Sequence, residues 1–170
     1  MRTYTSDRLV IKELSLTDDA FTFELVNTPG WIRFIGDKNI KSLKDAINYI
    51  QKIINSPNIN YWVVSLKETC LPIGVVTLIK RDYLDHSDIG FAFLPQYAKN
   101  GYAFEAATLV LRDVISNPLH TRILATTLKG NLNSIKLIER LGLKFEKVIS
   151  VENESLQLYS AEIKDLALSK

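Results

Sequence analysis

The sequence predicts an α+β (mixed α/β) domain built around a largely antiparallel β-sheet. Three observations support this fold class: runs rich in β-branched and aromatic residues, apolar positions at helical spacing, and the order in which the two kinds of run alternate. Along the chain this order is one strand, two helices, three strands, a helix, a strand, a helix and two strands. Because the 170 residues contain no repeat and no Pro/Gly/Ser linker, we expect one domain over residues 1–170.

The first half predicts a strand followed by two helices. A β-branched run at residues 8–12 predicts the strand, and Ser15-Leu16-Thr17-Asp18 forms a capping box that opens a helix through about residue 25. A second capping pair, Ser42 with Asp45, opens an amphipathic helix that Asn55-Ser56-Pro57 ends. The segment between the two helices, residues 27–37, is apolar but loop-like.

The second half predicts a β-meander and then an alternation of helices and strands. The meander has strands at residues 61–66, 73–79 and 88–94. Helices are expected at residues 101–114 and 132–141, and the remaining strands at 122–127, 145–151 and 155–163.

Composition and charge exclude several classes of protein. Hydrophobic residues at 46% and charged residues at 24% are typical of a globular chain, and 21 basic and 19 acidic residues are scattered without a basic stripe. We therefore expect neither a nucleic-acid partner nor a membrane partner. The only cysteine, Cys70, excludes an intramolecular disulfide, and the first residues lack the apolar core of a signal peptide. A cytoplasmic location follows as the expectation.

Residues 94–106 form the most informative passage, because a strand, a turn and a helix start follow one another directly. A helix N-terminus exposes unpaired N–H groups and the positive end of the helix dipole, which suit an anionic group such as a nucleotide pyrophosphate. Gly101 would let a phosphate approach the backbone, and the small Ala103 would keep the next turn open. A plain glycine-assisted helix start explains the spacing equally well.

A second passage, residues 131–143, places Asn131 at a helix N-cap and Ser134 in the first turn. Capping alone explains this placement. However, if the strands that precede the two helices are neighbours in one sheet, both helix starts lie at the same edge and frame one crevice.

Taken together, the two passages resemble the cofactor-side motifs of the GNAT superfamily of N-acyltransferases, and the closest branch is that of the ribosomal-protein N-terminal (alanine) acetyltransferases. The matching residues are 99–106, Asn131 with Ser134, 137–143, the opening run 5–12, the Thr-Asp-Asp helix start at 17–19, and Ile73-Gly74. The resemblance implies a three-layer fold with a central, mostly antiparallel twisted sheet flanked by helices. It also implies that an amine, either a protein N-terminus or a small molecule, attacks the thioester of acetyl-CoA directly.

The resemblance further implies which residues hold acetyl-CoA, the co-substrate. Backbone amides of the loop at residues 99–103 would bind the pyrophosphate, and the end of the splayed strand would pair with the pantetheine arm. Asn131 would contact the amide or phosphate groups, and Ser134 would lie near the sulfur, where its hydroxyl can protonate the departing thiolate. The implied cofactor residues are Phe93, Leu94, Lys99, Asn100, Gly101, Tyr102, Ala103, Asn131 and Ser134.

Two departures from the family pattern affect this assignment. The family commonly has Gln or Arg opening the phosphate loop and a second glycine inside it, whereas this chain has Ala98, Lys99 and Asn100. Many relatives carry a Tyr general acid where this chain has Ile138, which leaves Ser134 as the best remaining donor. These departures favour, as an alternative, a catalytically silent acyl-CoA-binding sensor of the same fold.

Asp88 is the candidate general base, acting through water, although a solvated strand-end carboxylate is the commoner case for such a residue. Trp31 and Phe34 lie in the segment expected to fold over the acceptor site and are candidates for binding the amine, with core packing as the alternative. His86 and His120 have no metal-ligand company, so we expect no metal.

A nucleotide-dependent transferase is a second alternative, but the sequence has no GxxxxGK[ST] loop. The identity of the amine stays open, as does the choice between a monomer and a homodimer.

Overall fold

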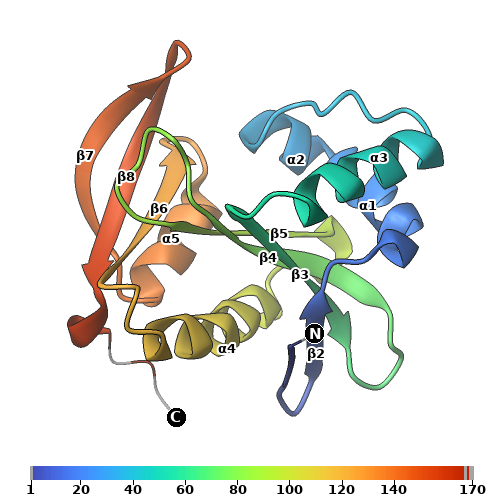
Figure 1. Cartoon of the computed structure of the whole chain (residues 1–170), viewed down its shortest axis with the longest axis horizontal. Helices are drawn as coiled ribbons and strands as arrows, with labels where there is room; N and C mark the ends of the chain where they lie inside the picture. The colour runs from blue at the N-terminus through green and yellow to red at the C-terminus, as the bar shows by residue number, and fades with distance from the viewer. Residues whose placement is uncertain (1, 167, 169–170) are drawn as a thin grey trace.

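The computed structural model describes residues 2–166 and 168, and its eight strands form one sheet in the order β1-β2-β3-β4-β5-β6-β8-β7 (Figure 1). In the described part of the chain, neighbouring strands pair antiparallel, except that β5 and β6 pair in parallel. This arrangement confirms the predicted fold class. The strands are β1 Thr3–Thr5, β2 Leu9–Glu13, β3 Ile59–Leu66, β4 Pro72–Ile79, β5 Asp88–Phe93, β6 Arg122–Leu128, β7 Lys144–Val151 and β8 Glu154–Glu162.

The helices cover both faces of the sheet and give the three layers that the resemblance implies. One core lies between the sheet and the first three helices, and a second lies between the sheet and the last two. Within the described chain, no helix has the length and apolarity that crossing a membrane requires. The helices are α1 Asp19–Val26, α2 Pro29–Phe34, α3 Leu43–Ile54, α4 Tyr102–Ser116 and α5 Leu132–Arg140.

Most elements begin and end within one or two residues of their predicted bounds, because their local signals hold in the structure. The N–H of Ser15 donates to Asp18 Oδ2 at 2.8 Å, ahead of a short 3-10 turn that leads into α1. The N–H of Asp45 donates to Ser42 Oγ at 3.1 Å and caps α3. Both predicted N-termini are thus confirmed.

The prediction of a loop at residues 27–37 is wrong, because this segment contains α2. Thr28 caps the helix by accepting a hydrogen bond at Oγ1 from the N–H of Trp31 at 3.4 Å, and Pro29 occupies the first helical position. A Thr-Pro pair is a recognised helix start, so the signal was present. The strand β1 was also not predicted, because three residues are too few to show an alternating pattern.

The sheet opens between β5 and β6. Within the described residues, their register contains a single pair, Asp88 with Leu124, and the N–H of Leu124 donates to the carbonyl of Ser87 at 3.1 Å. Beyond this pair the two strands diverge (Figure 1). The chain continues from β5 into α4 and from β6 into α5, so both helix starts border the opening. The expected crevice between two helix starts is therefore present.

A glycine on β4 sets how closely β4 and β5 approach at this opening. Gly74 faces Phe93 in the register, and a Cβ at Gly74 would lie 2.4–2.6 Å from three atoms of the Phe93 ring. Such a distance is far inside van der Waals contact, so only a glycine leaves room for the ring.

We expect Gly74→Ala to lower the free energy of unfolding by about 1–3 kcal/mol, because the added methyl group overpacks a strand pair. Urea denaturation measures the change. Gly30→Ala is the matched control, since a Cβ on that α2 glycine meets nothing within 4 Å. Equal stabilities for Gly74→Ala and Gly30→Ala would show that the Phe93 contact does not limit packing here.

Candidate functional site

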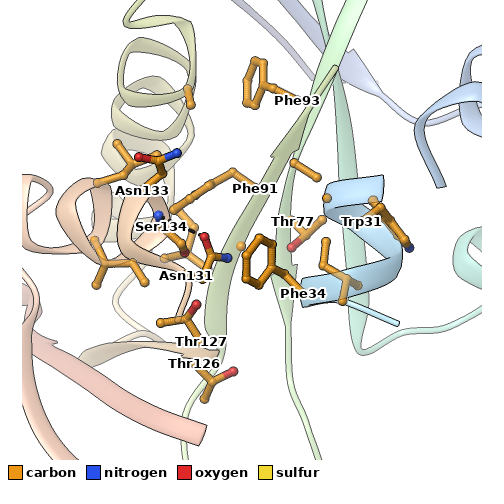
Figure 2. A pocket seen from close by; sticks show the side chains of 18 of the residues that line it. Trp31, Phe34, Thr77, Phe91, Phe93, Thr126, Thr127, Asn131, Asn133 and Ser134 are labelled. Atoms are coloured by element: carbon orange, nitrogen blue, oxygen red, sulfur yellow. Dashed lines mark hydrogen bonds between the residues drawn. The ribbon is translucent and has the colours of Figure 1, made fainter. Parts of the chain in front are cut away.

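A cleft of about 1140 Å³ passes through the opening between β5 and β6. One end lies against α2, the middle against the faces of β4 and β5, and the other end against the starts of α4 and α5. Figure 2 shows Phe34 of α2 and Asn131 at the start of α5 approaching the central strand from opposite sides. The volume suits a cofactor arm together with a second small group.

The structure brings all but two of the predicted site residues to this cleft. Leu94 instead packs in the core beneath the first three helices at 3% exposure, and its N–H donates to the carbonyl of Ile73. Asn100 is exposed, and its side-chain amide donates to the carbonyls of Tyr97 and Ala98. The predicted residues that line the cleft are Trp31, Phe34, Asp88, Phe93, Lys99, Gly101, Tyr102, Ala103, Asn131 and Ser134.

The loop before α4 has the backbone shape of an anion site. Lys99 and Gly101 adopt left-handed φ angles of 63° and 78°, whereas Asn100 between them does not. Such an alternation turns successive N–H groups toward one side. Across the described residues, the backbone N–H groups of residues 99–104 have no hydrogen-bond acceptor. These donors, at the positive end of the α4 dipole, can bind an anionic group.

The β5 backbone offers hydrogen-bonding groups to the gap. Backbone groups along a strand point alternately to its two sides. The N–H of Leu94, an even-numbered residue, bonds to β4, and the carbonyl of Ser87, an odd-numbered residue, bonds to β6. The odd-numbered residues Phe91 and Phe93 therefore direct their N–H and C=O groups toward the opening. Their side chains pack against the core on the α4 and α5 side. An extended ligand can therefore pair with β5 as a further strand would.

Asn131 and Ser134 mark the α5 side of the cleft. The N–H of Ser134 donates to Asn131 Oδ1 at 3.4 Å, so Asn131 does cap the helix, as its sequence position suggests. Both side chains are half-buried in the cleft wall. In the described part of the chain, the Ser134 hydroxyl has no hydrogen-bond partner. It is therefore available to a ligand.

The expectation of a solvated carboxylate at Asp88 is wrong. Asp88 is 3% exposed, and Arg81 Nε donates to its two carboxylate oxygens at 3.0 and 3.1 Å. Thr126 Oγ1 donates to Asp88 Oδ2 at 3.3 Å. Burial raises the pKa of the Asp88 carboxyl above its ordinary value, and the nearby Arg81 charge and these hydrogen bonds oppose that rise. Asp88 pairs with Leu124 in the described register of β5 and β6, at the point where the two strands are still adjacent.

The α2 end of the cleft is aromatic. Trp31 is 4% exposed and packs in the core beneath the first three helices, as the alternative of core packing predicted. It also lines the cleft. Its Nε1 is buried without a hydrogen-bond partner among the described residues. Phe34 is half-buried and points from α2 toward Thr77 (Figure 2). Nearby, the hydroxyls of Tyr49 and Tyr61 lie 3.4 Å apart, and burial raises the pKa of both.

Several residues of the cleft wall were not predicted from the sequence. Thr77 and Thr126 are polar residues within apolar strands, and this pattern is the signal that could have identified them. Arg81 carried no signal, because only the fold of the loop between β4 and β5 brings it to Asp88.

Known proteins that are similar to this chain include acetyltransferases, in agreement with the geometry of the cleft. The sequence matches the family model for the acetyltransferase (GNAT) domain over residues 8–144. It is 28% identical over 155 residues to YnaD of Bacillus subtilis, an uncharacterised N-acetyltransferase, with 88% of this chain and 89% of the relative covered.

Two solved acetyltransferases share the fold. Spermidine N-acetyltransferase from Vibrio cholerae, in complex with CoA and spermine, has a TM-score of 0.80 at 17% identity and covers 94% of this chain and 98% of its own. Ribosomal-protein-S5-alanine acetyltransferase from Vibrio fischeri has a TM-score of 0.78 at 16% identity, with coverages of 98% and 99%. With the family match spanning most of the sequence and the open sheet between two helix starts, this chain belongs to the GNAT acetyltransferase family.

Proposed function

We propose that this protein transfers the acetyl group of acetyl-CoA to a primary amine, either a protein N-terminus or a small molecule. The observation that carries the proposal is the opening between β5 and β6, where N–H groups at the α4 start and a stretch of β5 backbone have no partner among residues 2–166 and 168. An anionic, extended cofactor with amide groups matches both features. Acetyl transfer itself is the activity of the family to which the chain belongs.

In this proposal, the chain positions acetyl-CoA along three surfaces. The N–H groups of residues 99–103 bind the pyrophosphate, and Lys99 adds a positive charge beside it. The backbone of Phe91 and Phe93 pairs with the pantetheine amides, while the Asn131 side chain contacts the arm from the α5 side. The thioester then lies against β5, where a backbone N–H can polarise its carbonyl.

The reaction proceeds by direct attack. The amine nitrogen forms a bond to the thioester carbonyl carbon, and the carbon–sulfur bond then breaks to release the thiolate. Ser134 gives its hydroxyl proton to that sulfur. Its Oγ lies at the cleft wall and has no partner in the described structure, whereas Ile138, at the position of the usual tyrosine, is 2% exposed and apolar. The serine is reprotonated from solvent after the product leaves.

Asp88 takes the amine proton through a bound water. Its burial supports this role, because a carboxylate whose pKa is raised accepts a proton more readily than an ordinary surface aspartate. Arg81 holds the carboxylate in place at the closed end of the gap.

The amine enters at the α2 end, where Trp31 and Phe34 supply apolar contacts. The two solved relatives named above act on a polyamine and on a ribosomal protein, so one fold accommodates acceptors of very different size.

Release of free thiol from acetyl-CoA across a panel of amines and N-terminal peptides tests the proposed function, with CoA binding measured by calorimetry. We expect turnover on at least one class of amine. Gly101→Glu should weaken CoA binding, because it adds a negative charge at the helix start that attracts the pyrophosphate, whereas Gly101→Ala imposes similar backbone strain at φ +78° without the charge. Tight CoA binding with no turnover on any amine would instead favour a sensor.

We expect Ser134→Ala to lower kcat by about 100-fold, the scale of a lost general acid, while CoA affinity changes little. Steady-state kinetics and calorimetry separate the two effects. Leu132→Ala, in the same helical turn but exposed and outside the cleft wall, serves as the control and should leave kcat near the wild-type value. Unchanged turnover in Ser134→Ala would remove the serine from the mechanism.

The pH dependence of kcat/KM tests Asp88. A base acts only when deprotonated, so activity should rise with pH through a limb whose midpoint lies above the ordinary aspartate pKa of about 3.9. Asp88→Asn should eliminate this limb and leave only the limb of the acceptor amine. Thr126→Val should move the limb to higher pH, because the Thr126 hydrogen bond lowers the pKa of Asp88. An identical acidic limb in Asp88→Asn contradicts the assignment.

A further inference from the structure

Arg8, the residue before β2, connects the N-terminal segment to the loop that precedes α4. Its Nη1 donates to the backbone carbonyl of Asn100 at 3.1 Å. Its Nε and Nη2 donate to Glu105 Oε2 at 2.8 and 2.5 Å. The guanidinium carbon also lies 4.6 Å from the centre of the Tyr102 ring. One side chain thus contacts the loop, the first turn of the helix and an aromatic ring at the cleft.

The bond to the Asn100 carbonyl orients a backbone donor. The described chain has no cis peptide, and in a trans peptide the C=O and the following N–H point in opposite directions. Arg8 lies outside the cleft wall, whereas Gly101 lines it. Holding the Asn100 carbonyl toward Arg8 therefore turns the N–H of Gly101 toward the cleft. A glycine at φ +78° rotates easily, so this peptide gains most from an external restraint.

The same contact controls the charge beside the loop. Ser6 Oγ donates to Glu105 Oε1 at 2.6 Å while Arg8 holds Oε2, so both oxygens of this carboxylate are occupied on the outer side of the helix. A free carboxylate in the first turn would repel a phosphate bound at the same helix end. Arg8 neutralises that charge and keeps it away from the cleft.

Stability alone does not explain this arrangement. The side chains of Arg8 and Glu105 are 48% and 23% exposed, and ion pairs with this exposure contribute little to folding. The N-terminal segment makes a second ion pair to the same helix, Arg2 Nη1 to Asp113 Oδ2 at 2.5 Å, which lies more than two turns further along, away from the loop. This second pair joins the same elements without touching the phosphate loop.

We propose that Arg8 is a positioning residue that holds the Asn100–Gly101 peptide with its N–H facing the pyrophosphate of acetyl-CoA. The proposal rests on the proposed function, because it assigns a role within that same cofactor site.

The test compares acetyl-CoA with S-acetylpantetheine, a donor that lacks the pyrophosphate and the nucleotide. Arg8→Ala should raise KM for acetyl-CoA by about tenfold or more, the scale of a weakened hydrogen bond to a charged group, with kcat nearly unchanged. Its kcat/KM with S-acetylpantetheine should equal that of the wild type. Arg8→Lys keeps the charge but loses the planar guanidinium, whose separate nitrogens bond Asn100 and Glu105, so it should also lose affinity for acetyl-CoA.

Arg2→Ala is the matched control and should behave as the wild type with both donors. Thermal unfolding of all three variants checks that the fold is retained. An equal loss on both donors would overturn the proposal, because it would mean a general structural effect, and so would an unchanged KM for acetyl-CoA in Arg8→Ala.

Binding measurements separate this proposal from the proposed function. If the wild type binds CoA but shows no turnover, the catalytic function fails, and calorimetry with CoA and with pantetheine still tests Arg8 through the same contrast. If the wild type does not bind CoA at all, both proposals are wrong.

Discussion

The parallel pairing of β5 and β6, confined in the described chain to Asp88 and Leu124, is the constraint on which the rest of the structure depends. Parallel neighbours require a crossover, which α4 supplies, and this places two helix starts at one edge of the sheet. Because the strands separate after one pair, backbone groups of Phe91 and Phe93 remain without a strand partner. Unpaired backbone groups need water or a ligand as hydrogen-bond partners, so the opening is suited to bind a ligand.

Packing on both faces keeps the opening at a defined width. On one face α4 lies close to the sheet because Ala106 and Ala107, both fully buried, add little bulk. On the other face Leu94 belongs to the core beneath the first three helices, which fixes the end of β5. Gly74 lets the Phe93 ring lie across β4 at the same point. The geometry of the cleft is therefore determined by core residues as much as by residues that face it.

Charge is distributed unevenly along the cleft. At the closed end, Asp88 is buried beside the partly exposed Arg81, and burial favours the protonated form of its carboxyl group. At the other end, backbone N–H groups, Lys99 and the α4 dipole present positive potential, and the carboxylate of Glu105 is held outside by Arg8 and Ser6. This polarity suits a ligand whose phosphates and reacting group lie at opposite ends.

The sequence by itself determined the features that arise from neighbouring residues: the order of the elements, the caps at Ser15 and Ser42, and the helix starts at Gly101 and Asn131. These follow from hydrogen bonds and periodicities within a few positions. Only the tertiary structure decided that Asp88 is buried against Arg81 and Thr126, and that Arg8 contacts Asn100, 92 residues away in the chain. Such contacts depend on how the strands pair and the loops fold, which no local pattern encodes.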